Sequence, residues 1–221
     1  VSIFLFWFFS NFSIDEVTNY KFIEANRDYF NNLKNKNLII LSLIFTLLTT
    51  LWILMLGFGS PVALLGGFIF GKWFGAFLAA LGSTFGATLV YLFASYFLKD
   101  FIKEKFSKKY KNLEEKFKKN EFSFFLIYRI IGGIPFAIAN LLPIIFNVSL
   151  KNYFFGTFLG ILPGLFIISS LGHGLEKVIQ ENNQPISFMK LILLPEIYIP
   201  ILFFLMLMLI SIVARKIFYK N

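Results

Sequence analysis

Cysteine is absent from the 221-residue chain, and histidine occurs only once, as His173. Disulfides, thiolate metal sites and cysteine nucleophiles are therefore excluded, and a single histidine cannot build a histidine-rich metal site. The chain also lacks a carboxylate pair at a useful spacing, a GxSxG motif and a phosphate-binding glycine loop. We therefore expect no enzyme, no cofactor and no bound metal.

Charged residues are scarce as well, at 15% of the chain against about a quarter in a typical soluble domain. Hydrophobic residues make up 57% and aromatic residues 20%, and the mean hydropathy is +0.74. These values predict an all-α polytopic membrane protein with a single domain over residues 38–221. Residues 1–37 are expected to precede it as an interfacial segment, because residues 14–37 mix charges with apolar residues at the spacing of a helix on the membrane surface.

Four apolar runs are long enough to cross about 30 Å of hydrocarbon at 1.5 Å per residue. They cover residues 38–58, 73–98, 153–172 and 191–213.

Two other apolar stretches, residues 59–71 and 122–146, contain helix-breaking residues. The breaks are Gly59, Pro61, Gly66 and Gly67 in the first stretch and Gly132, Gly133 and Pro135 in the second. Irregular backbone at membrane depth is tolerated only where protein or a wet cavity satisfies its polar groups. We therefore predict two re-entrant helical hairpins, which enter from opposite faces of the membrane.

Charge placement supports this topology. Residues 99–121 hold nine lysines against five acids, which predicts a cytoplasmic loop. The C-terminal tail, with Arg215, Lys216 and Lys220, is also basic. If residues 122–146 crossed completely, loop and tail would lie on opposite sides, whereas a re-entrant hairpin places both in the cytoplasm together with the N-terminus. The basic loop lacks arginine and has few aromatic residues, so we expect no nucleic-acid partner.

An internal repeat is consistent with hairpins of opposite orientation. The segment KWFGAFLAALGS, residues 72–83, resembles YFFGTFLGILPG, residues 153–164, and each copy follows one predicted hairpin. Because the first copy would start outside and the second inside, the two halves form an inverted repeat.

Arg129 is the sharpest chemical signal, since it lies about 10 Å deep if the chain from Phe122 is helical. A charge in a span costs at least about 2.5–3.5 kcal/mol, so something must offset it. One interpretation is that Arg129 extends back to cytoplasmic lipid phosphates. The other is that its guanidinium holds an anionic group between the hairpins, since this group pairs bidentately with phosphate. Asn140 is expected to hydrogen-bond either the broken backbone or a lipid head group.

Glu196 is the only carboxylate inside an apparent span, which suggests an ion-coupling role. Alternatively it lies at the outer interface within reach of Lys190. His173, beside Gly172 and Gly174, is interpreted as a helix-end residue in preference to a proton relay.

The order and spacing of several motifs resemble the DedA superfamily, also called VTT-domain or SNARE-associated Golgi proteins. They are Gly67-Phe68-Ile69-Phe70-Gly71, Leu81-Gly82 to Gly86-Ala87, Arg129 with Gly133-Ile134-Pro135-Phe136 and Asn140, and Gly156 to Gly160 with Pro163-Gly164. The resemblance covers about residues 38–175. It implies two facing re-entrant hairpins, a functional arginine at position 129, and movement of phospholipids or polyprenyl phosphate between leaflets.

The chain departs from this family pattern at several positions. Gly132 replaces a hairpin proline, and Ser95 stands where many relatives have an arginine, although Lys99 lies one turn further on. The acidic residues of proton-dependent relatives have no counterpart, because Ser60-Pro61 and Ala87 occupy those regions. Passive scrambling is therefore favoured over proton coupling.

Together these features predict a lipid scramblase or flippase in a bacterial inner membrane, with membrane lipids as partners and Arg129 and Asn140 at the lipid phosphate. A homo-oligomer is compatible with the sequence. The alternatives are an ion- or proton-coupled transporter of a small solute that uses Glu196, and a non-transporting membrane scaffold.

Overall fold

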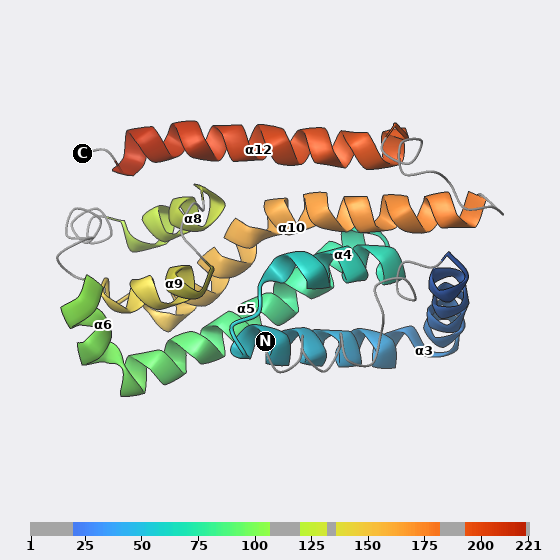
Figure 1. The fold of residues 1–221 in the computed structure, drawn as a ribbon. Coiled ribbons are helices and arrows are strands. Elements are labelled where there is room, and N and C mark those ends of the chain that lie inside the picture. Colours follow the sequence, from blue (N-terminus) through green and yellow to red (C-terminus); the bar gives the residue numbers. More distant parts are fainter. Residues whose placement is uncertain (1–19, 107–119, 132–135, 182–192, 220–221) are drawn as a thin grey trace.

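The computed structural model describes residues 20–106, 120–131, 136–181 and 193–219, and all regular elements in these ranges are helices (Figure 1). They are α3 (Tyr20–Leu54), α4 (Gly59–Phe70), α5 (Lys72–Phe97), α6 (Lys99–Phe106), α8 (Glu121–Ile131), α9 (Phe136–Leu141), the 3-10 turn η2 (Leu142–Ile144), α10 (Leu150–Glu181) and α12 (Pro195–Tyr219). The all-α prediction is therefore confirmed for the described residues. The predicted breaks at Gly132, Gly133 and Pro135 lie outside them, as do residues 1–19 and 107–119.

Three helices in the described ranges are long and apolar enough to cross a membrane, namely Lys36–Leu54, Lys72–Phe97 and Leu150–Val178. They match the predicted spans 38–58, 73–98 and 153–172, with the last one longer at both ends. Helix α12 covers the fourth predicted span.

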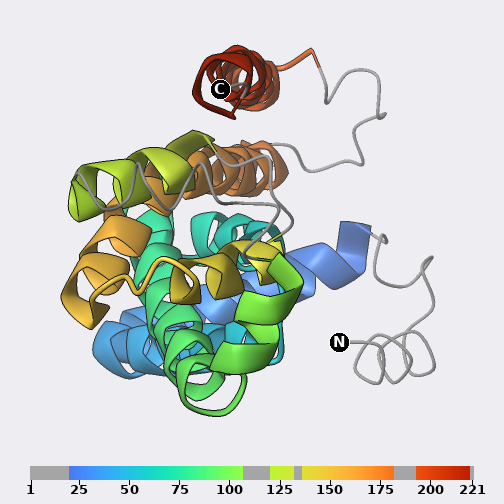
Figure 2. The same cartoon turned by 90° about the vertical axis from the view of Figure 1, so that its left-hand side faces the viewer.

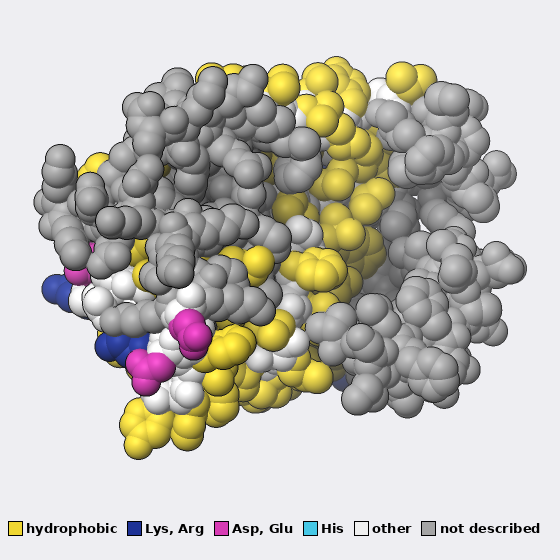
Figure 3. Space-filling model, turned by 60° about the vertical axis from the view of Figure 1, so that its left-hand side comes forward, with side chains coloured by type: hydrophobic (Ala, Val, Ile, Leu, Met, Phe, Trp, Pro, Cys, Tyr) yellow, Lys and Arg dark blue, Asp and Glu magenta, His cyan; other side chains and the backbone are white. Residues whose placement is uncertain are grey.

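Apolar side chains cover much of the exterior. Ile39 is 72% exposed and Leu43 is 65% exposed. Figure 3 shows hydrophobic side chains over much of the described surface, with lysine and acidic side chains gathered at one end. Such an exterior is stable in hydrocarbon and unfavourable in water.

Helix α3 lies parallel to α5 and ends before it. A Cβ added to Gly82 would lie 2.7 Å from Cβ of Thr49, and one added to Gly86 would lie 2.6 Å from Cβ of Ile53. The two glycines of α5 therefore let the backbone of α3 approach closely. Because α3 ends one residue after Ile53 while α5 continues to Phe97, the apolar part of α3 reaches only part of the way along α5.

Helix α4 then returns in the opposite direction. It begins near Ser83, whose Oγ would lie 3.7 Å from a Cβ at Gly59. It ends near Lys34, whose Nζ donates to the Ile69 carbonyl at 3.3 Å. We call α3 from Lys36 onward, together with α4, the first helical pair. The sequence predicted residues 38–58 as a complete span, and in the structure the matching segment Lys36–Leu54 packs mainly on α5 and lies beside α4.

The prediction that Gly66 and Gly67 split residues 59–71 into two arms is wrong, because α4 is one continuous helix. A Cβ at Gly67 would collide with the backbone of Ser169 in α10, and one at Gly66 would lie 2.9 Å from the carbonyl oxygen of Gly75. These glycines therefore allow close helix packing and do not break the helix. Pro61 lies in the first turn, where the missing N–H leaves no intrahelical bond unmade.

Helices α8 and α9 form the second helical pair. The Tyr128 hydroxyl of α8 donates to the Ala139 carbonyl of α9 at 3.0 Å, so a side chain of α8 connects the two helices. At the open end of the pair, a Glu121 carboxylate oxygen accepts hydrogen bonds from the Ser149 amide at 2.6 Å and from Asn152 Nδ2 at 2.9 Å. The start of α8 therefore lies beside the start of α10, and the chain enters and leaves the second helical pair at the same level of the bundle.

The two pairs point toward each other from opposite ends of the bundle (Figure 1). We call these the α6 end, which holds α6 and the starts of α8 and α10, and the Lys72 end, which holds the starts of α5 and α12 (Figures 1 and 2). Residues of both pairs belong to one buried cluster, which includes Ile53 of α3, Ala87 of α5, Tyr128 of α8 and Leu142 of η2.

The described ends of the chain lie apart. The first part of α3 is at the Lys72 end, and the C-terminal end of α12 is at the α6 end (Figure 1). The sequence predicted both termini and the lysine-rich loop on the same side of the membrane. The structure instead places residues 20–36 at the end opposite α6, where that loop begins.

The packing of α4 on α10 can be tested with two glycines of α10. A Cβ at Gly172 would collide with the carbonyl oxygen of Leu64 in α4, whereas a Cβ at Gly164 would meet nothing within 4 Å. We expect Gly172→Ala to cost about 1–3 kcal/mol, which lowers the melting temperature in detergent by about 2–4 °C per kcal/mol. Gly164→Ala should leave it unchanged or raise it slightly, since Ala favours helix over Gly by about 1 kcal/mol. Equal melting temperatures of the two variants would contradict the packing.

Candidate functional site

Arg129 occupies the last turn of α8 and is only 8% exposed. Its position is set by α10, where a Cβ added to Gly160 would collide with the Arg129 Cβ, just as one added to Gly156 would lie 2.6 Å from the ring of Phe125. The two glycines are four residues apart and receive two α8 side chains that are also four residues apart. This spacing brings the α8 backbone close enough to α10 to bury the arginine.

The guanidinium of Arg129 is held inside the bundle and does not extend to the surface. Its Nη1 donates to Oδ1 of Asn140 at 2.9 Å, and its Nη2 donates to the hydroxyl of Tyr153 at 2.9 Å. The Cζ atom lies 5.2 Å from the ring centres of both Phe125 and Tyr153, within the range of cation–π attraction. The structure thus brings together the two predicted site residues, Arg129 and Asn140, and disfavours the interpretation that Arg129 extends to cytoplasmic phosphates.

Tyr153 is the site residue that the sequence did not reveal. It is fully buried, stacks on Tyr91 with ring centres 4.2 Å apart, and directs its hydroxyl toward the carbonyl oxygens of Ala87 at 3.1 Å and Asn140 at 3.3 Å. The tyrosine therefore connects α5, α9 and α10 to the guanidinium. Its only sequence signal was its place at the start of the second repeat copy.

The positive charge of Arg129 has no counter-charge among the described residues. Both hydrogen-bond partners are neutral, and in the described ranges no carboxylate lies within 4 Å of the guanidinium. Two buried donors there, Arg129 Nε and Asn140 Nδ2, make no hydrogen bond. A buried cation with unused donors beside it is an unfavourable arrangement that an anion would relieve. The site is therefore suited to hold an anionic group.

Glu121 closes the open end of the second helical pair. Besides the Ser149 amide and Asn152, the Ser149 hydroxyl donates to the same carboxylate oxygen at 2.9 Å. Burial acts to raise the pKa of the Glu121 carboxyl, but the hydrogen bonds from Asn152 and Ser149 outweigh it and hold the pKa below its ordinary value. The carboxylate is therefore charged at neutral pH and joins the start of α8 to the start of α10.

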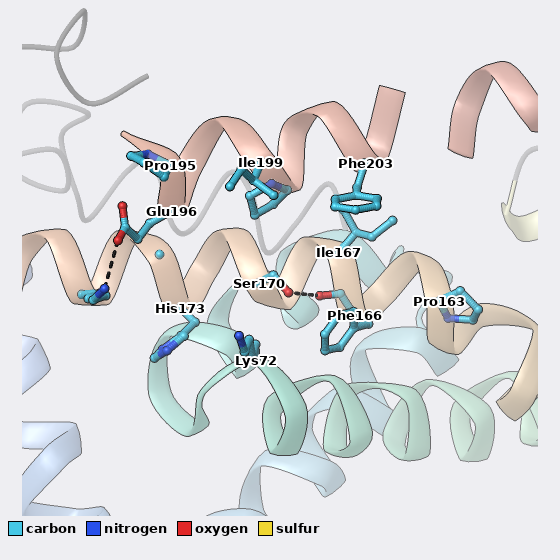
Figure 4. Close-up of a pocket in the computed structure, with 13 residues that line it drawn as sticks. Lys72, Pro163, Phe166, Ile167, Ser170, His173, Pro195, Glu196, Ile199 and Phe203 are labelled. Atoms are coloured by element: carbon cyan, nitrogen blue, oxygen red, sulfur yellow. Dashed lines mark hydrogen bonds and ion pairs between the residues drawn. The ribbon is translucent and has the colours of Figure 1, made fainter. Parts of the chain in front are cut away.

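Glu196 lies away from this site, in the first turn of α12. Its Oε1 accepts a hydrogen bond from Lys177 Nζ of α10 at 2.9 Å, so its partner is Lys177, whereas the predicted partner Lys190 lies outside the described residues. Glu196 and Lys177 line a cavity of about 770 Å³ between α10 and α12 (Figure 4). His173 also lines it, 3.9 Å from Glu176, within α10 and not at its end. In the described ranges no three acidic or histidine side chains are grouped as for a metal ion.

Apolar spanning helices around a buried, uncompensated cation define a polytopic membrane protein. Residues 56–174, more than half of the chain, match the family model of the VTT domain, and the chain belongs to this family, that of the DedA and SNARE-associated Golgi proteins. The match contains α4, α5, α8 and α9 and most of α10. No curated protein and no solved structure matches the chain. The family resemblance inferred from the sequence is therefore confirmed.

The contribution of Glu121 can be measured through its pH dependence. Because its pKa in the folded protein is lowered, its stabilisation is present at neutral pH and is lost as the pH falls through that lowered pKa. Glu121→Gln should lower the melting temperature at pH 7 by about 2–4 °C, for a loss of about 1 kcal/mol. The difference from the parent should vanish at a pH below the lowered pKa. Glu104→Gln, at an exposed position of α6, is the matched control and should have no such effect. A Glu121→Gln deficit independent of pH would contradict the assignment.

Proposed function

We propose that this protein moves a phosphate-bearing membrane lipid passively between the two leaflets, as a transporter and not as an enzyme. The observation that carries the proposal is the buried guanidinium of Arg129, which has neutral partners and unused donors around it. A lipid phosphate supplies the missing negative charge, and its oxygens accept from Nε of Arg129 and Nδ2 of Asn140. Phospholipids and polyprenyl phosphate both carry this group.

In a membrane, the two helical pairs would be re-entrant hairpins that enter from opposite faces. The buried cluster that residues of both pairs share and the hydrogen bonds of Glu121 across the open end of the second pair support this. The first hairpin is then α3 with α4, in place of residues 59–71 alone. Neither pair needs to cross the bilayer, because α4 packs on α5 and α10 and α8 packs on α10.

The packing also supports the inverted repeat. In the aligned segments 72–83 and 153–164, Gly75 corresponds to Gly156. A Cβ at Gly75 would collide with Gly66 of α4, and one at Gly156 would lie 2.6 Å from Phe125 of α8. The matched glycine therefore faces the preceding helical pair in both halves, through the second arm, α4, in the first half and through the first arm, α8, in the second.

We place the α6 end in the cytoplasm of a bacterial inner membrane, because the lysine-rich segment begins there. Each lysine near the surface attracts anionic lipid by about 1 kcal/mol. The C-terminal end of α12 is then cytoplasmic, whereas residues 20–36 lie at the outer face. A lipid enters with its head group near the second hairpin, meets Arg129 at the hairpin tips, and leaves at the Lys72 end while its chains stay in hydrocarbon.

The direct test is reconstitution into liposomes that contain a fluorescent phospholipid or polyprenyl phosphate. We expect the label to equilibrate between leaflets without an imposed gradient. No transport with either lipid at normal folded yield would refute the proposal. Transport that requires a pH difference would instead favour the coupled transporter that uses Glu196.

Arg129 can be tested by a graded pair of variants. Arg129→Gln removes the charge and should slow lipid transport about tenfold or more, since a hydrogen bond to a charged group contributes about 1.5–3 kcal/mol. Arg129→Lys keeps the charge but loses the planar fork, so its rate should lie between those of Arg129→Gln and the parent. The rates are compared at equal folded yield in the liposome assay. If Arg129→Gln transports lipid at the same rate as the parent protein, Arg129 is not part of the transport site.

Asn140→Asp separates stability from transport. The new carboxylate would lie where Asn140 Oδ1 now accepts from Arg129 at 2.9 Å, and the replaced Nδ2 makes no hydrogen bond in the described structure. The variant therefore supplies the counter-charge internally, and its melting temperature should equal or exceed that of the parent. Transport should fall about tenfold or more, because the guanidinium is already neutralised. Unchanged transport in a stable Asn140→Asp protein would show that the free charge is not needed.

A further inference from the structure

The cavity of about 770 Å³ at the Lys72 end, between α10 and α12, is separate from the Arg129 site. Its volume lies within the range of about 300–1,000 Å³ typical of sites for small ligands. One part of its wall is apolar and includes Phe166, Ile167, Ile199 and Phe203. The wall thus resembles the surroundings of a hydrocarbon chain.

Polar groups line the part of the cavity nearer the end of the bundle. They are Lys72 from α5, Ser170, His173 and Lys177 from α10, and Glu196 from α12. Figure 4 shows Lys72 and His173 on one side of α10 and Glu196 on the other, toward α12. Glu196 is already paired with Lys177, so the carboxylate and that ammonium balance each other. Lys72 adds one positive charge that forms no ion pair with a described acid, while the carboxylate of Glu176 lies 3.9 Å from Nδ1 of His173.

The position of Lys72 in its own helix makes this charge unfavourable. It is the first residue of α5, the first turn contains no acidic residue, and the helix dipole disfavours a cation there. In the described structure Lys72 makes no hydrogen bond or ion pair. An anion at this point would therefore interact favourably with both the ammonium and the amino-terminal end of the helix.

The repeat gives an independent reason to consider Lys72. In the aligned segments it occupies the position that Tyr153 occupies in the second copy, and Tyr153 binds the guanidinium of Arg129. The related position in the first half thus carries a cationic side chain at the opposite end of the bundle.

The cavity also lies on the face of α10 that receives Arg129. The positions along this face are 156, 160, 163, 167, 170, 174 and 177, each three or four residues from the last. Helix α8 covers Gly156 and Gly160, and the cavity is lined by the other five positions. Lys177 lies about 25 Å beyond Gly160 at 1.5 Å per residue, whereas Pro163 lies only about 5 Å beyond it. The cavity therefore extends from the Lys72 end almost to the level of Arg129.

We propose that this cavity binds a phosphate-bearing lipid, with the phosphate at Lys72 and His173 and one hydrocarbon chain along Phe166, Ile199 and Phe203. The inference deepens the proposed function, on which it rests, by assigning the lipid a second binding position in the outer leaflet. The polar part lies at the membrane surface and the apolar part toward the centre, in the orientation of an outer-leaflet lipid.

The test is photolabelling of the full-length protein with a single-chain lipid phosphate that carries a diazirine in its chain. Labelled peptides are identified by mass spectrometry, and we expect labelling of the segments of α10 and α12 that line the cavity. Lys72→Met should reduce this labelling by about threefold, the effect of one exposed ion pair of up to about 1 kcal/mol. Lys36→Met is the matched control, since Lys36 is also exposed, lies at the Lys72 end and does not line the cavity. It should label like the parent.

A photoactivatable alcohol with the same chain separates the head group from the chain, and should label the cavity less than the phosphate does. Equal labelling by alcohol and phosphate, or equal labelling of Lys72→Met and the parent, would overturn the proposal. Liposome transport measured on the same preparations distinguishes the two failures. If labelling depends on Lys72 but no lipid is transported, the cavity site stands and the proposed lipid translocation is refuted. If lipid is transported but labelling does not depend on Lys72, the translocation stands and the cavity site is refuted.

Discussion

The structure depends on one constraint, which is the burial of the Arg129 guanidinium without a carboxylate partner among the described residues. An isolated charge in a low-dielectric interior is costly, and neutral oxygens and aromatic faces compensate it only in part. The surroundings of Arg129 supply both kinds of compensation through Asn140, Tyr153 and the ring of Phe125. Asn140 reaches the guanidinium from α9, so the placement of α9 beside the end of α8 and the burial of the charge depend on each other.

Close packing of short helices provides the frame for this site. A helix of 11 residues such as α8 cannot cross the bilayer, and hydrophobic burial does not drive helix association in lipid. Glycines at contact points compensate by letting backbones approach closely, and α10 provides four of them, at positions 156, 160, 172 and 174. Gly156 and Gly160 receive the second helical pair, whereas Gly172 receives α4 of the first. Helix α10 therefore fixes the two pairs relative to each other, and with them the depth of Arg129.

The sequence predicted the site where a residue had one plausible role, as Arg129 did. It misled where a residue type has two structural roles, as glycine does when it either breaks a helix or allows close packing. A lone arginine beside Gly-Gly-Ile-Pro pointed to the site, and Asn140 was the nearby polar residue able to contact it. Tyr153 was missed because aromatic residues form 20% of the chain and nothing local distinguishes it. Gly66 and Gly67 were interpreted as breaks, although glycine also marks close approach, and only a neighbour such as Ser169 decides between the two. The run 38–58 has the length of a span, but length does not reveal that α4 turns back beside it.

The proposed passive lipid pathway also limits how strongly any one site can bind, because a head group held too tightly would not leave. At Arg129 this limit is met by the neutral partners. Asn140 and Tyr153 already accept from Nη1 and Nη2, so a phosphate would find Nε and the Asn140 amide and not the complete guanidinium fork. The attraction is then reduced by competition while the charge remains, which lowers the barrier for a phosphate in hydrocarbon without creating a deep well. A carboxylate in place of Asn140 would remove the attraction, and loss of both acceptors would leave the empty site with a larger desolvation cost.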